Sequence, residues 1–407
     1  MGIIHQVLHP PLSLTMISVP GAASFPIGTD DSGTCCNVNY PYYIAQTEVT
    51  FQQWSTVYTW AVSHGYTFAH TGSRGAFISK ERDERYDPQP YESGHDSDPV
   101  THINWRDTIV WCNALTEYCN AHNGTNLGCV YNWGGNPIRN STDTIICDTV
   151  VPEKNAKGFR LPTSMEWELA ARYKGNDSSN GAIFLGGLYW TPSNYASGAA
   201  GSVADPSATL EVAWTKENST VPDSNIYSTQ PVGTKTANFL GVFDMSGNVE
   251  EWSFDIDFEG FRIIRGGNWR SNLIYLGVSK GSICDPGCAI ATLGFRPVRV
   301  ENLVPPKTLV SISISPIPGP KVGKTNWEGV TAYFYHDFTA KGYYSDGTKE
   351  DITLGCTWYS DDPSVCLINS SGRFDYRGLG STTIHALKDG INSSISIYTK
   401  YYSATWN

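Results

Sequence analysis

Residues 244–252 read Asp-Met-Ser-Gly-Asn-Val-Glu-Glu-Trp, and residues 265–269 read Arg-Gly-Gly-Asn-Trp. A tryptophan closes each stretch, and a large aromatic side chain such as Trp252 is typical of an anchor in a domain with little regular structure. The double glycine Gly266-Gly267 lets the backbone approach its neighbours closely. The two stretches therefore predict a loop-rich domain that is held together by a few large side chains and sharp turns.

Short helices are expected upstream of these stretches. Thr50 followed by Gln53 is a capping-box pattern, so it predicts a helix start. A second helix should begin near Asn104, and a third should span residues 164–172 with Thr163 or Ser164 as its cap. Strands are expected at residues 25–28 and 42–45. Long irregular stretches at 70–99 and 175–230 indicate functional loops on a small scaffold.

Four segments, taken in order, resemble the formylglycine-generating-enzyme (sulfatase-modifying factor) family. They are Ile44 to Thr50, Gly158 to Arg172, Asp244 to Trp252, and Arg265 to Trp269 closing at Leu293-Gly294-Phe295-Arg296. The resemblance implies an α+β domain of the C-type lectin fold over residues 23–300, after an N-terminal extension at 1–22. It is very specific because the four segments keep their order over a long stretch of chain.

Charged side chains of these segments have two expected roles. Arg160, Arg172 and Arg296 should be buried or half-buried partners of carboxylates such as Glu48, Glu168 or Glu251. The resemblance also implies that Asn248 and Glu251 could bind a structural Ca²⁺ through oxygen ligands. The alternative is that Glu251 pairs with an arginine. No other cofactor is expected.

The catalytic residues of the family are missing from this sequence. The oxidase activity of the family depends on two copper-binding cysteines, which follow the second glycine of the pair by four and nine residues. Counted from Gly267, those positions hold Ser271 and Leu276 in this sequence. Neither supplies the soft thiolate that Cu(I) needs. Cys284 and Cys288 lie in a later loop, without a third ligand. We therefore expect a protein that binds rather than catalyses; an enzyme with an unrecognised site is the alternative.

In the segment between the double glycine and Leu293, scaffold residues alternate with chemically unrelated side chains: Ser, Ile, Cys, Asp, Ala and Thr. This pattern resembles the variable proteins of diversity-generating retroelements, in which a reverse transcriptase alters template adenines in such a segment. The resemblance implies a diversified binding surface at residues 268–293. The expected ligand-binding residues are Arg270, Ser271, Asn272, Ile274, Tyr275, Ser282, Ile283, Cys284, Asp285, Cys288, Ile290, Ala291 and Thr292. The alternative is an undiversified lectin-like domain.

The same segment indicates the kind of partner. An aromatic and aliphatic centre with a polar rim favours a protein ligand over a small molecule. A glycan ligand is less favoured because the calcium–sugar motifs of true C-type lectins, Glu-Pro-Asn or Gln-Pro-Asp, are absent. The expected partner is therefore a protein or glycan on a cell surface.

A second domain follows a linker at residues 301–307. Residues 308–407 alternate and turn as short strands do, which predicts an all-β sandwich. Ser345 to Thr348 predicts a hairpin turn, and Trp358 an inter-sheet anchor. The pattern resembles bacterial Ig-like group 2 domains, which are spacers or attachment modules on bacterial surfaces and phage particles.

Composition narrows the remaining functions. The formal net charge is −11, so a nucleic-acid partner is not expected. No apolar run approaches the roughly 20 residues of a membrane span, and no secretory signal is visible at the N-terminus. A tail-associated phage protein or a bacterial surface adhesin is expected. The ten cysteines allow disulfides such as Cys129–Cys147, or Cys356–Cys366 beside Trp358, but buried free thiols explain them equally well.

Overall fold

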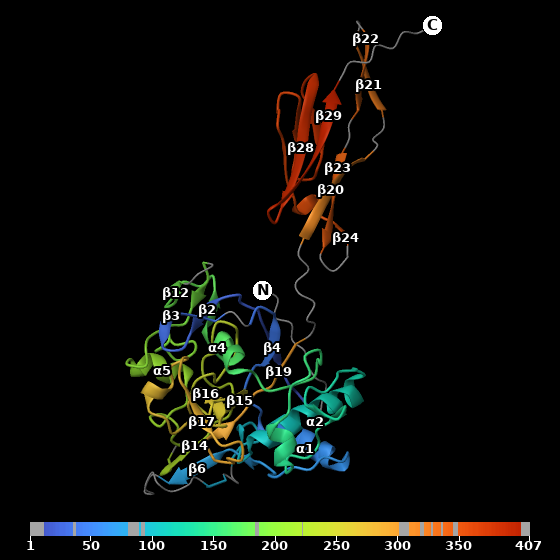
Figure 1. Ribbon diagram of the computed structural model, residues 1–407. Helices are drawn as coiled ribbons and strands as arrows, with labels where there is room; N and C mark the ends of the chain where they lie inside the picture. Colours follow the sequence, from blue (N-terminus) through green and yellow to red (C-terminus); the bar gives the residue numbers. More distant parts are fainter. Residues whose placement is uncertain are drawn as a thin grey trace. The chain divides into compact units, whose positions relative to one another are not determined.

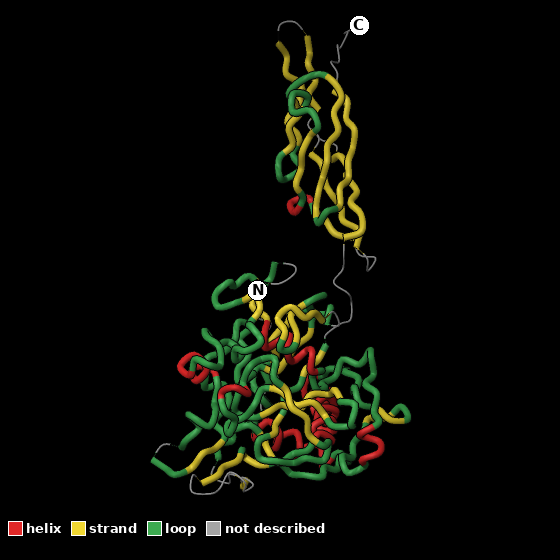
Figure 2. Tube along the Cα trace, turned by 60° about the vertical axis from the view of Figure 1, so that its left-hand side comes forward, coloured by secondary structure: helices red, strands yellow, loops and turns green. Residues whose placement is uncertain are grey.

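The protein divides into two compact units, Met1–Leu303 and Val304–Asn407 (Figure 1). The computed structural model describes residues 12–35, 38–79, 89–90, 94–183, 187–221, 223–300, 309–317, 321–326, 329–334, 337–344 and 349–399. The expected linker at 301–307 and the expected hairpin turn at Ser345–Thr348 lie outside these residues. Unit 1 is mostly loop with short helices and strands, whereas unit 2 is almost entirely strand (Figure 2).

The helices described in unit 1 are α1 (Phe51–Ser63), α2 (Trp105–Asn123), α3 (Thr144–Asp148), α4 (Ser164–Arg172) and α5 (Pro206–Val212). The sequence predicted α1, α2 and α4 with their caps, but neither α3 nor α5. Capping boxes start α1 at Thr50, α2 at Asn104 and α4 at Thr163. Helices α1 and α2 lie side by side (Figure 1). Within the described ranges, no helix is long and apolar enough to cross a membrane.

The strands of unit 1 are short and form several small sheets. They are β1 (Met16–Val19), β2 (Phe25–Ile27), β3 (Asp30–Cys35), β4 (Tyr42–Ala45), β5 (Ser73–Arg74), β6 (Ala76–Ser79), β7 (Gln89–Pro90), β8 (Val100–Thr101), β9 (Asn132–Trp133), β10 (Asn136–Pro137), β11 (Tyr173–Gly175), β12 (Ala182–Ile183), β13 (Tyr189–Trp190), β14 (Ile226–Ser228), β15 (Glu250–Ile256), β16 (Arg262–Arg265), β17 (Gly281–Cys284), β18 (Leu293–Gly294) and β19 (Val298–Arg299). Strands β5 to β7 fall inside the stretch 70–99, which the sequence pattern predicts as loop only.

One four-stranded sheet carries the two stretches that decide the fold. Its order is β17-β16-β15-β18, with β15 and β16 antiparallel and β15 and β18 parallel. In the registers of β15, Glu251 lies opposite Arg265 of β16 and Gly294 of β18. The sheet therefore brings the motif at 244–252, the double glycine and the closing segment at 293–296 together.

The N-terminal part of unit 1 belongs to its core. Leu12, Leu14 and Met16 are buried in the main apolar cluster, and β1 pairs antiparallel with β4. These residues fall within the segment 1–22, which the sequence analysis assigns to an extension. Their burial is explained by strand pairing with a distant segment, which sequence spacing does not reveal.

Buried tryptophans and arginine–carboxylate pairs fill the interior of unit 1. Trp252 packs in the first apolar cluster and Trp167 in the second, as expected of anchors. Arg160 pairs with Glu166, with an Nη2 to Oε1 distance of 2.5 Å. Arg172 pairs with Glu168 through its Nε at 2.9 Å. The Arg172–Glu168 pair lies within α4, whereas Arg172 Nη1 also pairs with Asp31 Oδ1 of β3 at 2.8 Å and so joins two segments that are far apart in the sequence.

Unit 2 is a two-layered β structure. Its strands are β20 (Leu309–Ile317), β21 (Lys321–Asn326), β22 (Gly329–Phe334), β23 (Asp337–Tyr344), β24 (Lys349–Asp351), β25 (Thr357–Ser360), β26 (Cys366–Ile368), β27 (Phe374–Tyr376), β28 (Gly380–Lys388) and β29 (Ile391–Thr399), with a 3-10 turn η2 at Thr353–Gly355. Side chains from the sheet β20-β23-β24 and the sheet β25-β28-β29 share one apolar cluster that includes Trp358. The predicted α+β unit followed by a β-sandwich is confirmed.

Six of the cysteines in the described residues are free and buried: Cys112, Cys119, Cys129, Cys147, Cys356 and Cys366. The disulfides Cys129–Cys147 and Cys356–Cys366, which the sequence allowed, are not formed. Burial raises the pKa of these thiols, most clearly in unit 1, which favours the unreactive protonated form. They act as small apolar side chains of the core.

Candidate ligand-binding site

The double glycine turns the chain sharply out of β16. Gly266 has a φ of 97° and Gly267 a φ of 68°, values that L side chains rarely adopt. A Cβ atom on Gly267 would lie 2.8 Å from Cδ2 of Leu276 and 3.2 Å from the carbonyl oxygen of Tyr275. The turn therefore requires glycine at this position. It starts the loop at 268–272 and the 3-10 turn η1 (Leu273–Tyr275).

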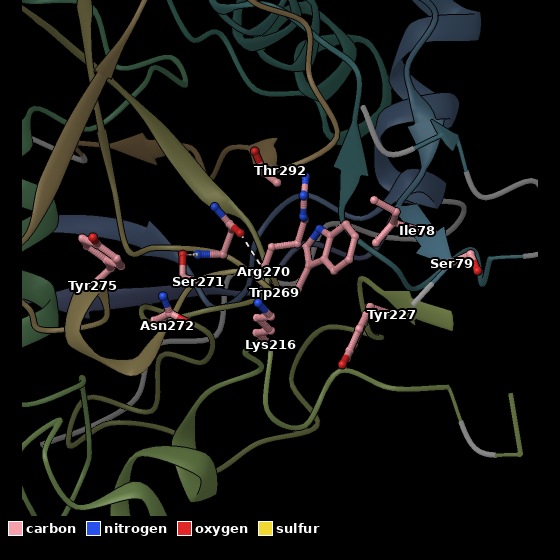
Figure 3. A pocket seen from close by; sticks show the side chains of 11 residues that line it. Ile78, Ser79, Lys216, Tyr227, Trp269, Arg270, Ser271, Asn272, Tyr275 and Thr292 are labelled. Atoms are coloured by element: carbon pink, nitrogen blue, oxygen red, sulfur yellow. Dashed lines mark hydrogen bonds between the residues drawn. The ribbon is translucent and has the colours of Figure 1, made fainter. Parts of the chain in front are cut away.

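A pocket of about 540 Å³ opens beside this loop (Figure 3). Trp269 lies at its base and is buried against Ala76, Val249 and Ala291. One side is formed by β6 and β14, on which Ile78 and Tyr227 are opposite each other. The full lining is Ile78, Ser79, Lys216, Tyr227, Asn268, Trp269, Arg270, Ser271, Asn272, Tyr275 and Thr292.

Hydrogen bonds from the Asn268 and Ser271 side chains and from residues 216–219 hold the backbone of the loop. The Asn268 backbone N–H donates to Ser271 Oγ at 3.0 Å, and the Arg270 N–H donates to Asn268 Oδ1 at 2.8 Å. The Asn268 Nδ2 donates to Glu250 Oε2 at 2.8 Å. Two further hydrogen bonds connect the loop to residues 216–219. The Lys216 backbone N–H donates to the Ser271 carbonyl oxygen at 3.4 Å, and Ser219 Oγ donates to the Trp269 carbonyl oxygen at 3.0 Å.

Five of the predicted ligand-binding residues line this pocket: Arg270, Ser271, Asn272, Tyr275 and Thr292. Ile274 is 58% exposed on η1 but is not part of the lining. Two lining residues inside the segment 268–293, Asn268 and Trp269, were not predicted as ligand-binding, and four more lie outside that segment: Ile78, Ser79, Lys216 and Tyr227. These four come from the stretches 70–99 and 175–230, and the irregularity of those stretches was the sequence signal that pointed to them.

Apart from Thr292, the predicted residues after Tyr275 lie outside the pocket lining. Ser282 and Ile283 are exposed on β17, which has β16 as its neighbour in the sheet. The loop after β17 reaches the start of α2, where the Trp105 N–H donates to the Pro286 carbonyl at 3.2 Å and the His102 N–H to that of Ile290 at 3.3 Å. Asp285, Cys288 and Ile290 therefore form a second group, next to α2 and away from the pocket lining.

Three of the predicted residues differ from expectation. Cys284 and Cys288, expected as separate exposed side chains, form a disulfide. Ala291, expected to contact ligand, is only 1% exposed and packs against Trp269. The small side chain of Ala291 supports the base of the pocket rather than its surface.

The two positions that would hold the catalytic cysteines of the family have different surroundings. Ser271 lines the pocket, and its hydroxyl accepts the Asn268 N–H. Leu276 is fully buried in a small apolar cluster with Ala196, Val212 and Ala213. Because Leu276 is buried and Ser271 carries a hydroxyl, this pair of positions does not supply two thiolates to a metal.

Asn248 and Glu251 do not fit a calcium site. Both side chains are fully buried. The two carboxylate oxygens of Glu251 accept hydrogen bonds from Arg296 at 2.7 Å and 2.6 Å, and Oε2 also accepts the Trp167 Nε1–H at 2.8 Å. The Asn248 amide bonds Glu48 Oε2 at 3.1 Å and both backbone groups of Gln230. The arginine pairing of Glu251, expected as the alternative, is the one observed.

Two further carboxylates share this buried region. Burial raises the pKa of Glu48 well above its ordinary value and that of Asp244 to about 6. Asp244 Oδ2 accepts the Gly233 N–H at 2.6 Å. Within the described part of the chain, no group of three or more His, Cys, Asp or Glu side chains is arranged to hold a metal ion. Arg296 is the cation that pairs directly with Glu251 in this region.

The loop-rich α+β unit, with a pocket behind a double-glycine turn, is a domain of the C-type lectin type. Residues 13–301 match the family model of the sulfatase-modifying factor enzyme 1-like domain, and the chain belongs to this family. This confirms the family and fold predicted for unit 1.

Solved structures agree with this assignment. CarF is 27% identical and covers 71% of this chain and 99% of its own, with a TM-score of 0.52. Variable protein 1 of Treponema denticola is 24% identical and covers 73% of this chain and 99% of its own, with a TM-score of 0.51. The second likeness shows a shared fold.

Curated relatives cover smaller parts of the chain. Chaperone protein LppX of Paenibacillus barcinonensis is 28% identical over 220 residues, which are 49% of this chain and 69% of LppX. Ice-binding protein 1 of Shewanella frigidimarina is 33% identical over 110 residues, which are 27% of this chain and 11% of that protein.

Proposed function

We propose that this protein is a non-catalytic, ligand-binding member of the family, and that residues 268–293 display a diversified binding surface. The observation that carries the proposal is the pocket beside the double glycine, where Arg270, Asn272 and Tyr275 project from a backbone that other groups hold in place. Such a loop can change its side chains without losing its fold. The likeness to a variable protein of the same fold supports this reading.

The proposal extends to the setting in which the surface acts. A binding unit joined to a β-sandwich suits display on a phage particle or on a bacterial surface, toward a protein or glycan of another cell. The strand-rich unit 2 supports the role of a spacer or attachment module. The absence of base-reading or phosphate-binding clusters in the sequence agrees with a partner other than nucleic acid.

The DNA around the gene tests the diversification. An adenine-rich near-copy of the segment that encodes residues 268–293, beside a reverse-transcriptase gene, is the expected result. Reads from a population of the source organism should then differ at codons such as those of Arg270 and Tyr275 while those of Gly266 and Trp269 stay constant. A complete genome with no such copy would contradict the diversification and leave the binding function standing.

Copper loading tests the alternative that the protein is an enzyme, namely an oxidase with an unrecognised site. The full chain is incubated with Cu(I), oxygen and a peptide that contains one cysteine, and the peptide thiol is followed by mass spectrometry. We expect no turnover, because Ser271 and Leu276 replace the thiolates that such chemistry needs. Oxidation that requires the protein and is abolished by Ser271→Ala would overturn the binding proposal.

A further inference from the structure

The Cys284–Cys288 disulfide closes a short loop at one edge of the four-stranded sheet. Cys284 is the last residue of β17, which is an edge strand in the order β17-β16-β15-β18. Cys288 begins the segment that leads to β18. Both side chains are half-buried and pack against the main apolar cluster. The disulfide therefore joins the end of an edge strand to the segment that follows the loop.

Two long hydrogen bonds hold this region to the start of α2. The Pro286 carbonyl oxygen accepts the Trp105 N–H at 3.2 Å, and the Ile290 carbonyl oxygen accepts the His102 N–H at 3.3 Å. Both distances lie at or beyond the long end of the usual range of about 2.7–3.2 Å, so these bonds are weak. We therefore expect the covalent link to contribute most of what fixes the loop.

The segment after the loop reaches the base of the pocket. Ala291 packs against Trp269, and its carbonyl oxygen accepts the Trp269 Nε1–H at 3.4 Å. Thr292 lines the same pocket (Figure 3), and its carbonyl oxygen accepts the Glu250 N–H at 2.8 Å. Only residues 289–291 separate Thr292 from Cys288. The disulfide thus lies on the same short stretch of chain that supports the pocket.

The disulfide is easier to reach than the other cysteines whose side chains are described. Ile283, Asp285 and Gly287, which neighbour the two bonded cysteines, are exposed. The free thiols are buried, and burial raises the pKa of each, which disfavours the reactive thiolate. Among these cysteines, a redox reagent should therefore act on Cys284 and Cys288 first.

We infer that the Cys284–Cys288 disulfide is a redox-sensitive clasp, whose reduction frees residues 285–290 and loosens the base of the pocket. The inference rests on the proposed binding function and names a regulation of the same surface: recognition requires the oxidised clasp. The frame of unit 1 does not depend on the clasp, because its buried clusters and ion pairs lie elsewhere.

The reductant is a dithiol. Its first thiolate attacks one sulfur of the clasp, forms a mixed disulfide and releases the other cysteine as a thiolate. Its second thiolate then closes the disulfide of the reductant and releases the remaining cysteine. Two electrons pass from the reductant to the clasp, and the two cysteine thiolates take up the two protons that the reductant loses.

This chemistry fits the proposed setting of the protein. Disulfides persist outside cells, whereas the cytosol keeps thiols reduced. A clasp that closes by oxidation completes the binding surface when the protein meets the external medium. Both cysteines also fall within residues 268–293. Under the proposed diversification the clasp is therefore a property of this variant, and other variants can lack it.

The first test follows the loop in the full chain, before and after treatment with dithiothreitol under native conditions. Alkylation with N-ethylmaleimide should then add two tags, at Cys284 and Cys288. Hydrogen exchange of residues 285–290 and of the Trp105 amide should become faster by about tenfold or more. The matched control is the double variant Cys284→Ser and Cys288→Ser, which should exchange as the reduced wild type does, with or without dithiothreitol.

The second test follows recognition. Peptides are selected from a random library of acetylated hexapeptides on an array with the oxidised full chain. Reduction should weaken their binding to the wild type by about tenfold or more. Dithiothreitol should not change their binding to the double serine variant. The wild type is compared with itself in two redox states, so the tests do not depend on how well a variant folds.

The outcomes separate the clasp from the proposed function. Cysteines that stay untagged, or that are tagged without faster exchange of residues 285–290, would overturn the clasp. Faster exchange with unchanged peptide affinity would overturn the redox control of recognition and leave the binding function in place. An oxidised protein that selects no peptide would count against the binding function, and the exchange rates would still decide whether the clasp exists.

Discussion

Unit 1 uses arginine in two opposite ways. Around Glu251, Arg296 is fully buried and makes paired hydrogen bonds to the carboxylate. Arg270 instead lies on the open pocket beside the double glycine. Loss of either partner of a buried ion pair lowers the free energy of unfolding, because the other charge then remains in a low dielectric without a counter-charge. A side chain on an open pocket can be replaced at little cost to folding. We therefore expect the buried frame around Arg296 and the proposed recognition surface to respond separately to substitution.

Removing the buried arginine should have the largest effect. We expect Arg296→Leu to lower the free energy of unfolding of unit 1 by about 3–5 kcal/mol, because it leaves Glu251 buried without its cation. Calorimetric unfolding of the full chain measures this. The control is Arg139→Leu, which breaks the exposed pair with Glu117 and should cost less than about 1 kcal/mol. If both variants lost the same free energy of unfolding, the buried arginine would be no more important to folding than the exposed one.

The base of the pocket should belong to the frame. Trp269 is fully buried, so Trp269→Ala should cost about 3–5 kcal/mol through a cavity and lost packing. Denaturant unfolding followed by near-UV circular dichroism is the measurement. A loss below about 1 kcal/mol would mean that the base of the pocket is as replaceable as its rim.

The carboxylates around Arg296 make the frame sensitive to pH. The raised pKa of Asp244, about 6, means that ionisation is harder in the folded than in the unfolded state. Its stabilising contribution is therefore fully present below the unfolded pKa of about 4, and is lost as pH rises through about 6. Glu48, Glu251, Arg296 and Lys235 are the charged groups that face it.

Asp244→Asn should isolate this contribution. Asparagine tolerates the φ of 55° at this position and can still accept the Gly233 N–H. Relative to the wild type, the variant should gain up to about 3 kcal/mol between pH 4 and pH 8, from about two pKa units at 1.36 kcal/mol each. Thermal unfolding across this range is the measurement. A difference that does not change with pH would show that Asp244 does not titrate in this window.

The frame was predictable from the sequence because its residues are fixed by local patterns and by packing. Thr50, Asn104 and Thr163 start their helices as the capping patterns require. Trp167, Trp252 and Arg296 are buried as predicted, because the two rings bury large apolar surfaces and the guanidinium pairs with Glu251.

The site was only half predictable. The segment that we propose to be variable contains Arg270, Asn272 and Tyr275, which follow the double glycine closely and line the pocket. Lys216 and Tyr227 join them through a backbone hydrogen bond and a pairing of β14 with β6 across long stretches of sequence. Such pairings depend on tertiary structure, and so does the burial of Ala291. Alternating side chains in one segment do not reveal which of them face inward.

Substitutions at the rim of the pocket, formed by Arg270, Asn272 and Tyr275, should have the smallest effect on folding. They should also show the largest difference between the effect on stability and the effect on binding. The triple variant Arg270→Ala, Asn272→Ala and Tyr275→Ala should change the free energy of unfolding by less than about 1 kcal/mol, because surface substitutions usually cost below about 0.5 kcal/mol each. The bonds that fix the loop use Asn268 and Ser271, which are unchanged. The same variant should lose at least tenfold in affinity for any peptide that the wild type selects. Unfolding and peptide binding measured on one preparation decide the matter: a large loss of stability would place the rim in the frame, and unchanged binding would place recognition elsewhere.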